Sequence, residues 1–228
     1  MSIKIESGVS GYQLILADGS VMWRDDKNKG MVTVERLHEY WRNPCGDNIE
    51  GAYFTCPERS QKLVGYFKKY VSPQDSIMEL GCNVGRNLHY LYESGYRNLT
   101  GIDINKKSLE LGEEHYPELK QTNLVCGEIG QELAKLESNS VDVIFTMAVL
   151  EHIHPKEQHI FSHIARVAKK YVITCEDEKA IFWRAFSYDY ESVFEYLALK
   201  QVEASSLLCK NDIDATGDCT LTYRIFKK

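Results

Sequence analysis

The chain has 228 residues, of which 43% are hydrophobic and 26% are charged, and its formal net charge is −6. This composition excludes wholesale disorder, and the length suits one α/β domain with a small appendage. An acidic chain without a long basic run is a poor candidate for binding nucleic acid, because phosphate contacts supply most of that affinity. Scattered cysteines, no apolar run of membrane-spanning length and no secretion signal predict a cytoplasmic protein that does not enter a membrane.

Residues 1–71 are predicted to form an N-terminal appendage of a hairpin and helices. An Asp-Gly pair between two strand-like runs, 12–16 and 21–24, predicts a β-hairpin. Apolar residues at helical spacing then predict one helix that begins near Thr33 and a second that Pro57 opens, with an aromatic loop between them. We expect this appendage to cover a substrate site.

Residues 72–228 alternate strand-like and helix-like segments, which predicts a doubly wound α/β sheet. The connection between the last two predicted strands is too short for a helical crossover, so these strands should pair antiparallel at one edge. Strands are expected over 76–80, 99–104, 123–126, 141–146, 171–175, 201–208 and 220–226, and helices over 84–94, 106–115, 131–136, 156–169 and 189–199.

A glycine turn, read as MELGCNVGRN from Met78, follows the first of these strands. In a doubly wound sheet such a turn lies beside the ligand: Gly81 permits a sharp exit from the strand, and Gly85 lets the first helical turn approach an anionic group. Asp103 ends the next strand, where an acid can accept the hydroxyl protons of a ribose. A structural alternative for Asp103 is stabilisation of the following helix N-terminus.

Two residues of this turn argue against a dinucleotide. Asn83 occupies the place of the middle glycine that would admit a pyrophosphate, and Glu79 would repel phosphates. An acid at position 79 suits a ligand with an ammonium group. Adenosine with an amino-acid tail therefore meets the demands of this turn.

The segment from Glu79 to Gly85 resembles the first motif of the class I S-adenosylmethionine-dependent methyltransferases, E/D-x-G-x-G-x-G. Asp103 matches the ribose-binding acid of that family, 127–129 matches its adenine segment, and 141–153 resembles its fourth strand and following loop. The resemblance implies a Rossmann-like seven-stranded sheet with the last strand antiparallel, and S-adenosylmethionine as the cofactor. It implies these cofactor-binding residues: Glu79, Gly81, Cys82, Asn83, Gly85, Arg86, Asn87, Asp103, Ile104, Glu128, Ile129 and Met147.

The loop that follows the fourth strand carries His152, which we interpret as a base or as a group that orients the methyl acceptor. The alternative is that His152 packs beneath the cofactor. Related ubiquinone-pathway O-methyltransferases carry an additional acid where this chain has Ala148, so no metal is expected. His159 and His163 have a spacing that can bind metal, but without an obvious third ligand they are interpreted as a helix flank.

Six further residues are predicted to contact the substrate. Two have clear alternatives: Trp41 as a core residue, and Arg184 as one partner of a surface ion pair. Arg59 could reach an anionic group, including the cofactor's carboxylate. The six residues are Trp41, Tyr53, Arg59, His154, Arg184 and Tyr188.

The sequence predicts a methyltransferase that acts on an oxygen or nitrogen of a small molecule, such as a sugar or a natural-product intermediate. A nicotinamide-dependent oxidoreductase is a rival, although the missing middle glycine argues against it. A methyltransferase fold that binds ligands without turnover is a second rival. Methylation of protein or RNA is a third.

Overall fold

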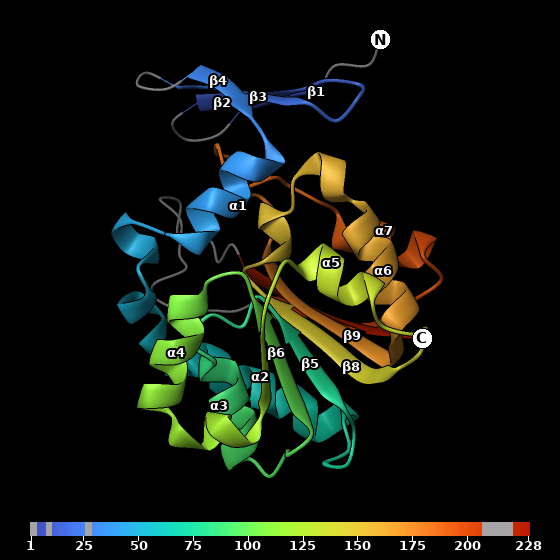
Figure 1. Cartoon of the computed structure of the whole chain (residues 1–228). Coiled ribbons are helices and arrows are strands. Elements are labelled where there is room, and N and C mark those ends of the chain that lie inside the picture. Colours follow the sequence, from blue (N-terminus) through green and yellow to red (C-terminus); the bar gives the residue numbers. More distant parts are fainter. Residues whose placement is uncertain (1–3, 8–10, 26–28, 207–220) are drawn as a thin grey trace.

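The computed structural model describes residues 4–7, 11–25, 29–206 and 221–228. A large mixed sheet with helices on both faces forms the body, and a small sheet lies above it, joined to the body through a short helix (Figure 1). The small sheet has the order β1-β2-β3-β4, and all its strand pairs are antiparallel. Its strands are β1 (Lys4–Ser7), β2 (Gly11–Ile15), β3 (Val21–Asp25) and β4 (Lys29–Val32).

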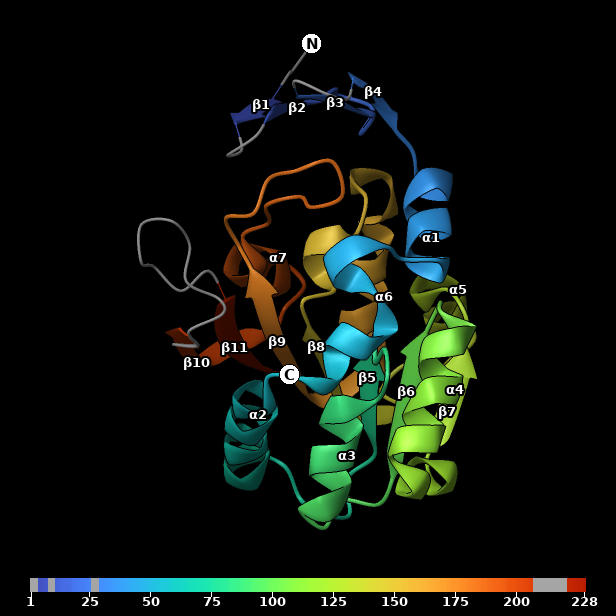
Figure 2. The same cartoon turned by 90° about the vertical axis from the view of Figure 1, so that its left-hand side faces the viewer.

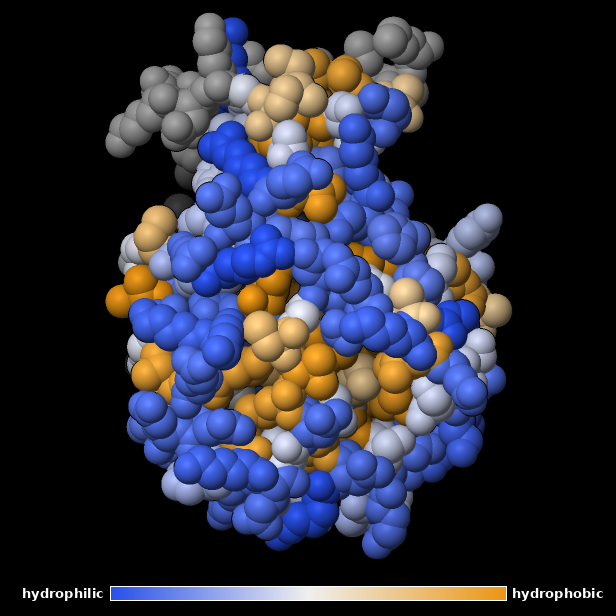
Figure 3. All heavy atoms as spheres, in the orientation of Figure 1, coloured by the Kyte–Doolittle hydropathy of each residue, from blue (hydrophilic) through white to orange (hydrophobic). Residues whose placement is uncertain are grey.

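The predicted hairpin is confirmed as the β2–β3 pair. Its turn uses Gly19 in the left-handed region, at φ +77°, where a residue without a side chain is least strained. The flanking strands β1 and β4 were not predicted, because each has only four residues and no clear alternation. One side of the sheet carries the exposed Met22 and Met31, and Figure 3 shows apolar residues at this end of the molecule.

Helix α1 (Val34–Arg42) begins where the Thr33 hydroxyl accepts a hydrogen bond from the Arg36 amide, and α2 (Pro57–Tyr70) begins at a proline. The predicted loop between them contains two 3₁₀ helices, Gly46–Asn48 and Glu50–Phe54. Helix α2 packs on the large sheet through its fully buried Leu63 and Phe67, and the Phe67 ring meets Phe145 edge-on. The division of the chain at residue 71 stays a prediction.

The large sheet has the order β10-β11-β9-β8-β5-β6-β7, with β11 antiparallel to both neighbours. The predicted fold class is thereby confirmed. The strands are β5 (Ile77–Leu80), β6 (Leu99–Asp103), β7 (Asn123–Cys126), β8 (Val141–Met147), β9 (Ala168–Asp177), β10 (Lys200–Ser206) and β11 (Leu221–Lys227). The helices are α3 (Arg86–Glu93), α4 (Lys106–His115), α5 (Ile129–Ala134), α6 (His159–Val167) and α7 (Tyr190–Tyr196), with 3₁₀ turns at Pro117–Gln121, Leu150–His152 and Pro155–Glu157.

Most predicted elements match within a few residues. The largest differences lie at β9, which is longer than predicted, and at α6. This helix is shorter than predicted, because a 3₁₀ turn precedes it and β9 already begins at Ala168. Residues 207 and 208 of one predicted strand and residue 220 of the other lie outside the described residues.

Apolar side chains cover both faces of the large sheet. Helices α2, α3 and α4 contribute to the core on one face, and α5, α6 and α7 to the core on the other (Figure 2). Strand β5 pairs with β6 on one side and β8 on the other, so the strand order reverses there. The carboxyl ends of these strands are where ligands bind in sheets of this kind. Within the described residues, no helix is both long and apolar enough to cross a membrane.

Candidate active site

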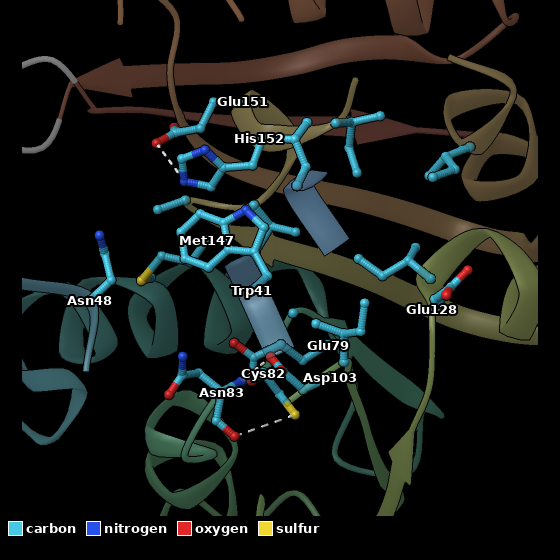
Figure 4. Close-up of a pocket in the computed structure, with 18 of the residues that line it drawn as sticks. Trp41, Asn48, Glu79, Cys82, Asn83, Asp103, Glu128, Met147, Glu151 and His152 are labelled. Carbon is cyan, nitrogen blue, oxygen red and sulfur yellow. Dashed lines mark hydrogen bonds and ion pairs between the residues drawn. The ribbon is translucent and has the colours of Figure 1, made fainter. Parts of the chain in front are cut away.

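A cavity of about 760 Å³ lies at the carboxyl ends of β5, β6 and β8. We call the part formed by Glu79, Gly81, Asn83 and Asp103 the cofactor half. The other part, the acceptor half, is formed by Trp41, Tyr53, His152, Phe182 and Arg184. Trp41 lies between His152 on one side and Glu79 and Asp103 on the other (Figure 4). The body and the appendage therefore both contribute walls to one cavity.

The two glycines of the turn are required by the protein's own side chains. Gly81 and Gly85 adopt φ +69° and +71°, a region that side chains disfavour. A Cβ on Gly81 would fall 2.5 Å from Val149 Cγ2, and one on Gly85 would fall 2.5 Å from Leu119 Cδ1. Gly85 itself is not among the residues that line the cavity, and the space beside it is occupied by Leu119, so its approach to a ligand stays a prediction.

Glu79 is buried at the end of β5 with one oxygen unsatisfied. Its Oε1 accepts a hydrogen bond from Asn87 Nδ2 at 2.7 Å, whereas Oε2 has no partner among the described residues. Burial raises the pKa of this carboxyl to about 8. A buried acceptor without a donor is costly, so this position favours a ligand that brings a hydrogen-bond donor or a positive charge.

Asp103 fixes the glycine turn and also faces the cavity. Its Oδ2 accepts the Asn83 amide at 2.7 Å and its Oδ1 accepts the Asn105 amide at 2.8 Å. Asn83 reaches this position with a left-handed φ of +49°, which asparagine tolerates better than most residues. Burial raises the pKa of Asp103 to about 6, although the backbone donors oppose this shift. Each oxygen retains capacity for a further hydrogen bond.

Other predicted cofactor residues surround these two acids. Arg86 donates to Ser60 Oγ at 3.0 Å and to the Tyr53 and Thr55 carbonyls at 3.2 and 2.5 Å, and so fastens the segment before α2 to the glycine turn. These bonds occupy much of the guanidinium. The remaining predicted residues that line the cavity are Cys82, Asn87, Ile104, Glu128, Ile129 and Met147.

Helix α1 is held over the cavity by an ion-pair cluster. Arg42 Nη2 lies 2.5 Å from Glu128 Oε1. His38 lies between Glu128 and Glu157: its Nδ1 is 3.5 Å from Glu128 Oε1, and its Nε2 is 3.2 Å from Glu157 Oε1. The hydrogen bond to Glu157 raises the pKa of His38, although burial opposes it. Glu128, predicted to face adenine, therefore also binds the appendage. We call this cluster the α1 latch.

His152 is held as a neutral imidazole. Its Nδ1 lies 2.7 Å from the Arg184 carbonyl, which can only accept, so Nδ1 carries the proton and Nε2 keeps its lone pair. Nε2 lies 3.6 Å from Glu151 Oε1, and the imidazole ring packs against Trp41 at 4.5 Å between centroids. Burial, followed by the charge of Arg184, lowers the pKa of His152 to about 4.

Two buried acids support the loop that carries His152. Glu176 Oε2 accepts the amides of Val149 and Leu150 at 2.8 and 2.9 Å, and Glu151 Oε2 accepts the Asp177 amide at 2.5 Å. Burial raises the pKa of Glu176 to about 7, and burial together with the neighbouring Glu176 raises that of Glu151. These bonds set the loop after β8 from inside the body.

The six predicted substrate residues divide into two groups. Four of them line the cavity: Trp41, Tyr53, Arg59 and Arg184. His154 and Tyr188 do not, and their prediction is corrected. His154 is buried and its Nε2 bonds to the Val32 carbonyl at 3.0 Å, so it joins the small sheet to the body. The Tyr188 hydroxyl donates to the Ile153 carbonyl at 2.7 Å and supports the same loop from behind.

Comparisons with known proteins agree with this geometry. A family model described as a methyltransferase domain matches residues 78–173. Magnesium protoporphyrin IX methyltransferase from Synechocystis PCC 6803, solved with bound SAH, superposes with a TM-score of 0.65 at 13% identity, and the match covers 85% of this chain and 97% of that one. This segment of the chain therefore matches the methyltransferase-domain family, and the fold is shared with solved S-adenosylmethionine-dependent methyltransferases. The same Synechocystis enzyme has also been solved with bound SAM.

Curated relatives are similar over parts of their length. The eEF1A lysine and N-terminal methyltransferase homolog of Drosophila melanogaster is 38% identical over 63 residues, which cover 26% of this chain and 9% of the relative. Phosphoethanolamine N-methyltransferase 2 of Caenorhabditis elegans is 22% identical over 153 residues, 67% of this chain and 34% of the relative. The chain thus spans at most about a third of the length of the curated relatives it matches.

Sequence reasoning missed cavity residues that no motif marks. His38, Asn48 and Glu157 line the cavity. The helical spacing placed His38 on the apolar face of α1, but the acids that it meets are distant in sequence. His159 and His163, interpreted as a helix flank, also line the cavity, and the described residues place no third metal ligand beside them.

Proposed function

We propose that this methyltransferase transfers the methyl group of S-adenosylmethionine to an oxygen or nitrogen of a small molecule. The observation that carries the proposal is one continuous, partly open cavity, which Glu79 and Asp103 line together with His152 and an aromatic wall. Reactants held in one space react as if at a very high local concentration. The roof formed by α1 and its latch favours a small acceptor over a folded protein surface.

The residues of the cofactor half fit S-adenosylmethionine. The unsatisfied Glu79 Oε2 matches its ammonium group, and the remaining capacity of the Asp103 oxygens matches the ribose hydroxyls. Both acids have a raised pKa, and a bound ammonium would offset the cost of ionising Glu79. A nicotinamide dinucleotide fits less well, because Asn83 occupies the position that would admit its pyrophosphate.

Methyl transfer from a sulfonium is an in-line displacement, for which the protein chiefly aligns the acceptor and excludes water. The bound cofactor supplies the activated methyl group. His152 presents the Nε2 lone pair while Nδ1–H is held by the Arg184 carbonyl, so it can orient an acceptor O–H or N–H. With a pKa of about 4 it is a weak base, and it accepts a proton only as the new bond makes the acceptor acidic.

A protein amine is a second candidate acceptor. The similarity to eEF1A lysine and N-terminal methyltransferases favours it, although the matched segment covers about a quarter of this chain. In this case a single side chain or chain terminus would enter the acceptor half.

The test has two parts. Calorimetry should show S-adenosylmethionine binding to the wild type, and at least tenfold weaker binding to Asp103→Ala, because the ribose loses a charged partner. Radiolabelled cofactor incubated with a cell extract should then label the small-molecule filtrate. Label in the protein fraction alone would establish the second candidate, and unchanged affinity of Asp103→Ala would refute the placement of the ribose.

A further inference from the structure

Arg184 stands on a rigid turn that the small sheet holds in place. Phe182 and Ala185 form an isolated antiparallel bridge, with amide-to-carbonyl distances of 3.3 and 3.0 Å. The buried Gln13 of β2 donates to both of their carbonyls, at 2.6 and 2.7 Å. The Arg184 carbonyl accepts from His152, as described above. The small sheet and the candidate catalytic loop therefore both fix the residue that presents this guanidinium.

The surroundings of the Arg184 guanidinium are aromatic. Its Cζ lies 4.7 Å from the centroid of the Phe182 ring, 5.3 Å from that of Tyr40 and 5.9 Å from that of Trp183. These ring faces attract a cation but accept no ordinary hydrogen bond. Among the described residues, the buried Nε of Arg184 has no hydrogen-bond partner. A buried guanidinium donor that is left unpaired is costly, so this position favours a ligand that accepts a hydrogen bond.

The rest of the acceptor half also combines an unpaired buried donor with aromatic walls. Trp41 Nε1 is also a buried donor without a partner within the described part of the chain. Trp41, Tyr53 and Phe182 supply flat, largely apolar walls. In the cofactor half the unsatisfied atom is an acceptor, Glu79 Oε2, whereas both unsatisfied atoms here are donors. A carboxylate, which accepts hydrogen bonds and carries one negative charge, complements this end of the cavity.

We infer that Arg184 binds a carboxylate on the methyl acceptor, and that the acceptor is a flat, apolar molecule that lies against Trp41 and Phe182. The inference rests on the proposed function, since it assigns the acceptor class of the same cavity. A carboxylate is favoured over a phosphate because the other two guanidinium groups that line the cavity are engaged. That of Arg86 is bonded to Ser60 and to two carbonyls, and Arg59 has an interaction partner of its own. One available guanidinium matches one negative charge.

Benzoate and benzamide make a matched pair of probes, equal in shape and different in charge. Each is titrated by calorimetry into the protein saturated with S-adenosylhomocysteine. Benzoate should bind at least tenfold more tightly than benzamide, and Arg184→Gln should remove this preference while the affinity for S-adenosylhomocysteine stays unchanged. Arg184→Lys should retain part of the preference, because lysine keeps the positive charge but lacks the paired N–H donors of the planar guanidinium.

Arg36→Gln is the matched control. Arg36 also lies over the Trp183 ring, at 4.9 Å, but its side chain is exposed and does not line the cavity. It should bind benzoate as the wild type does. Equal binding of benzoate and benzamide, no benzoate binding at millimolar concentration, or an unchanged preference in a folded Arg184→Gln would overturn the inference. Failure of the wild type to bind S-adenosylhomocysteine would instead refute the proposed function.

Discussion

The two halves of the cavity are built from the chain in different ways. In the cofactor half, a few residues at the ends of β5 and β6 form the site, and Asp103 accepts one backbone amide from the glycine turn, that of Asn83, and one from the residues after β6, that of Asn105. The acceptor half joins α1, the 3₁₀ segment around Tyr53, the loop after β8 and the turn that carries Arg184. Gln13 contacts that turn from more than 160 residues away. Local turn chemistry thus makes one half, and long-range packing makes the other.

The largest effect is expected where the two halves touch. Gly81→Ala should place a methyl group against Val149 in the loop that carries His152, and it also strains a left-handed backbone. We expect a loss of about 3 kcal/mol in the free energy of unfolding, and at least tenfold weaker cofactor binding. Urea unfolding and calorimetry measure both.

Gly46→Ala separates backbone strain from the clash. Gly46 has a similar φ of +64°, and nothing lies within 4 Å of a Cβ built on it. It should cost about 1 kcal/mol of stability. If the contact with Val149 matters, Val149→Ala should partly restore the stability of Gly81→Ala. Equal losses of stability in Gly81→Ala and Gly46→Ala would show that this contact does not matter.

A smaller effect is expected from breaking the long-range support of the acceptor half. Gln13→Ala removes one of the two donors that each carbonyl of Phe182 and Ala185 has and leaves only the bridge amides, and the loss of two hydrogen bonds should cost about 2 kcal/mol of stability. Affinity for S-adenosylhomocysteine should remain at the wild-type value, because the turn at 81–85 is untouched. Urea unfolding provides the first value and calorimetry the second. The control Gln74→Ala, at an exposed site, should change neither the stability nor the affinity for S-adenosylhomocysteine. A loss of this affinity in Gln13→Ala would mean that the two halves of the cavity are not independent.

The cofactor half should release a proton when it binds its ligand. The pKa of Glu79 is raised to about 8, so near pH 7 its carboxyl is mostly protonated before the ammonium arrives. Binding should therefore release up to about one proton, and affinity should rise as the pH rises towards 8. Calorimetry in two buffers of different ionisation enthalpy counts this proton.

Glu79→Gln should abolish the release, and the remote Glu203→Gln should not. The raised pKa of Glu79 also affects the stability of the protein without ligand. The folded state binds more protons than the unfolded chain between pH 4.5, the ordinary value for glutamate, and about 8. Glu79 therefore makes stability fall as the pH rises through this window. An equal release in the wild type and in Glu79→Gln would contradict the prediction.

The smallest effect belongs to the α1 latch. His38→Gln should cost less than about 1 kcal/mol, because its ion pairs are only partly buried. The pKa of His38 is raised in the folded state, so its contribution is complete below pH 6.5 and is lost as the pH rises through the folded value. Thermal melts of the variant and the wild type should therefore converge at alkaline pH, and a gap that stays constant with pH would refute this role.

The signals for the cofactor half are local in the sequence. The glycine turn, the acid at the end of the next strand and the alternation of strands and helices each depend on neighbouring residues, and the predicted fold is confirmed. The contact between Gly85 and Leu119 was not predicted, since Leu119 arrives from outside the turn. His154 was placed in the site by its proximity to His152, but its bond to Val32 turns it towards the small sheet. Tertiary contacts of this kind leave no pattern in a single sequence.

Trp41 gives the protein a built-in optical reporter. Its indole lies across the cavity between the two halves, whereas Trp23 is buried in the core beneath the small sheet and Trp183 stacks with arginine side chains. A protein in which Trp23 and Trp183 are replaced by phenylalanine would emit from position 41 alone. Stopped-flow mixing could then follow the arrival of each ligand separately and establish which of the two must enter first.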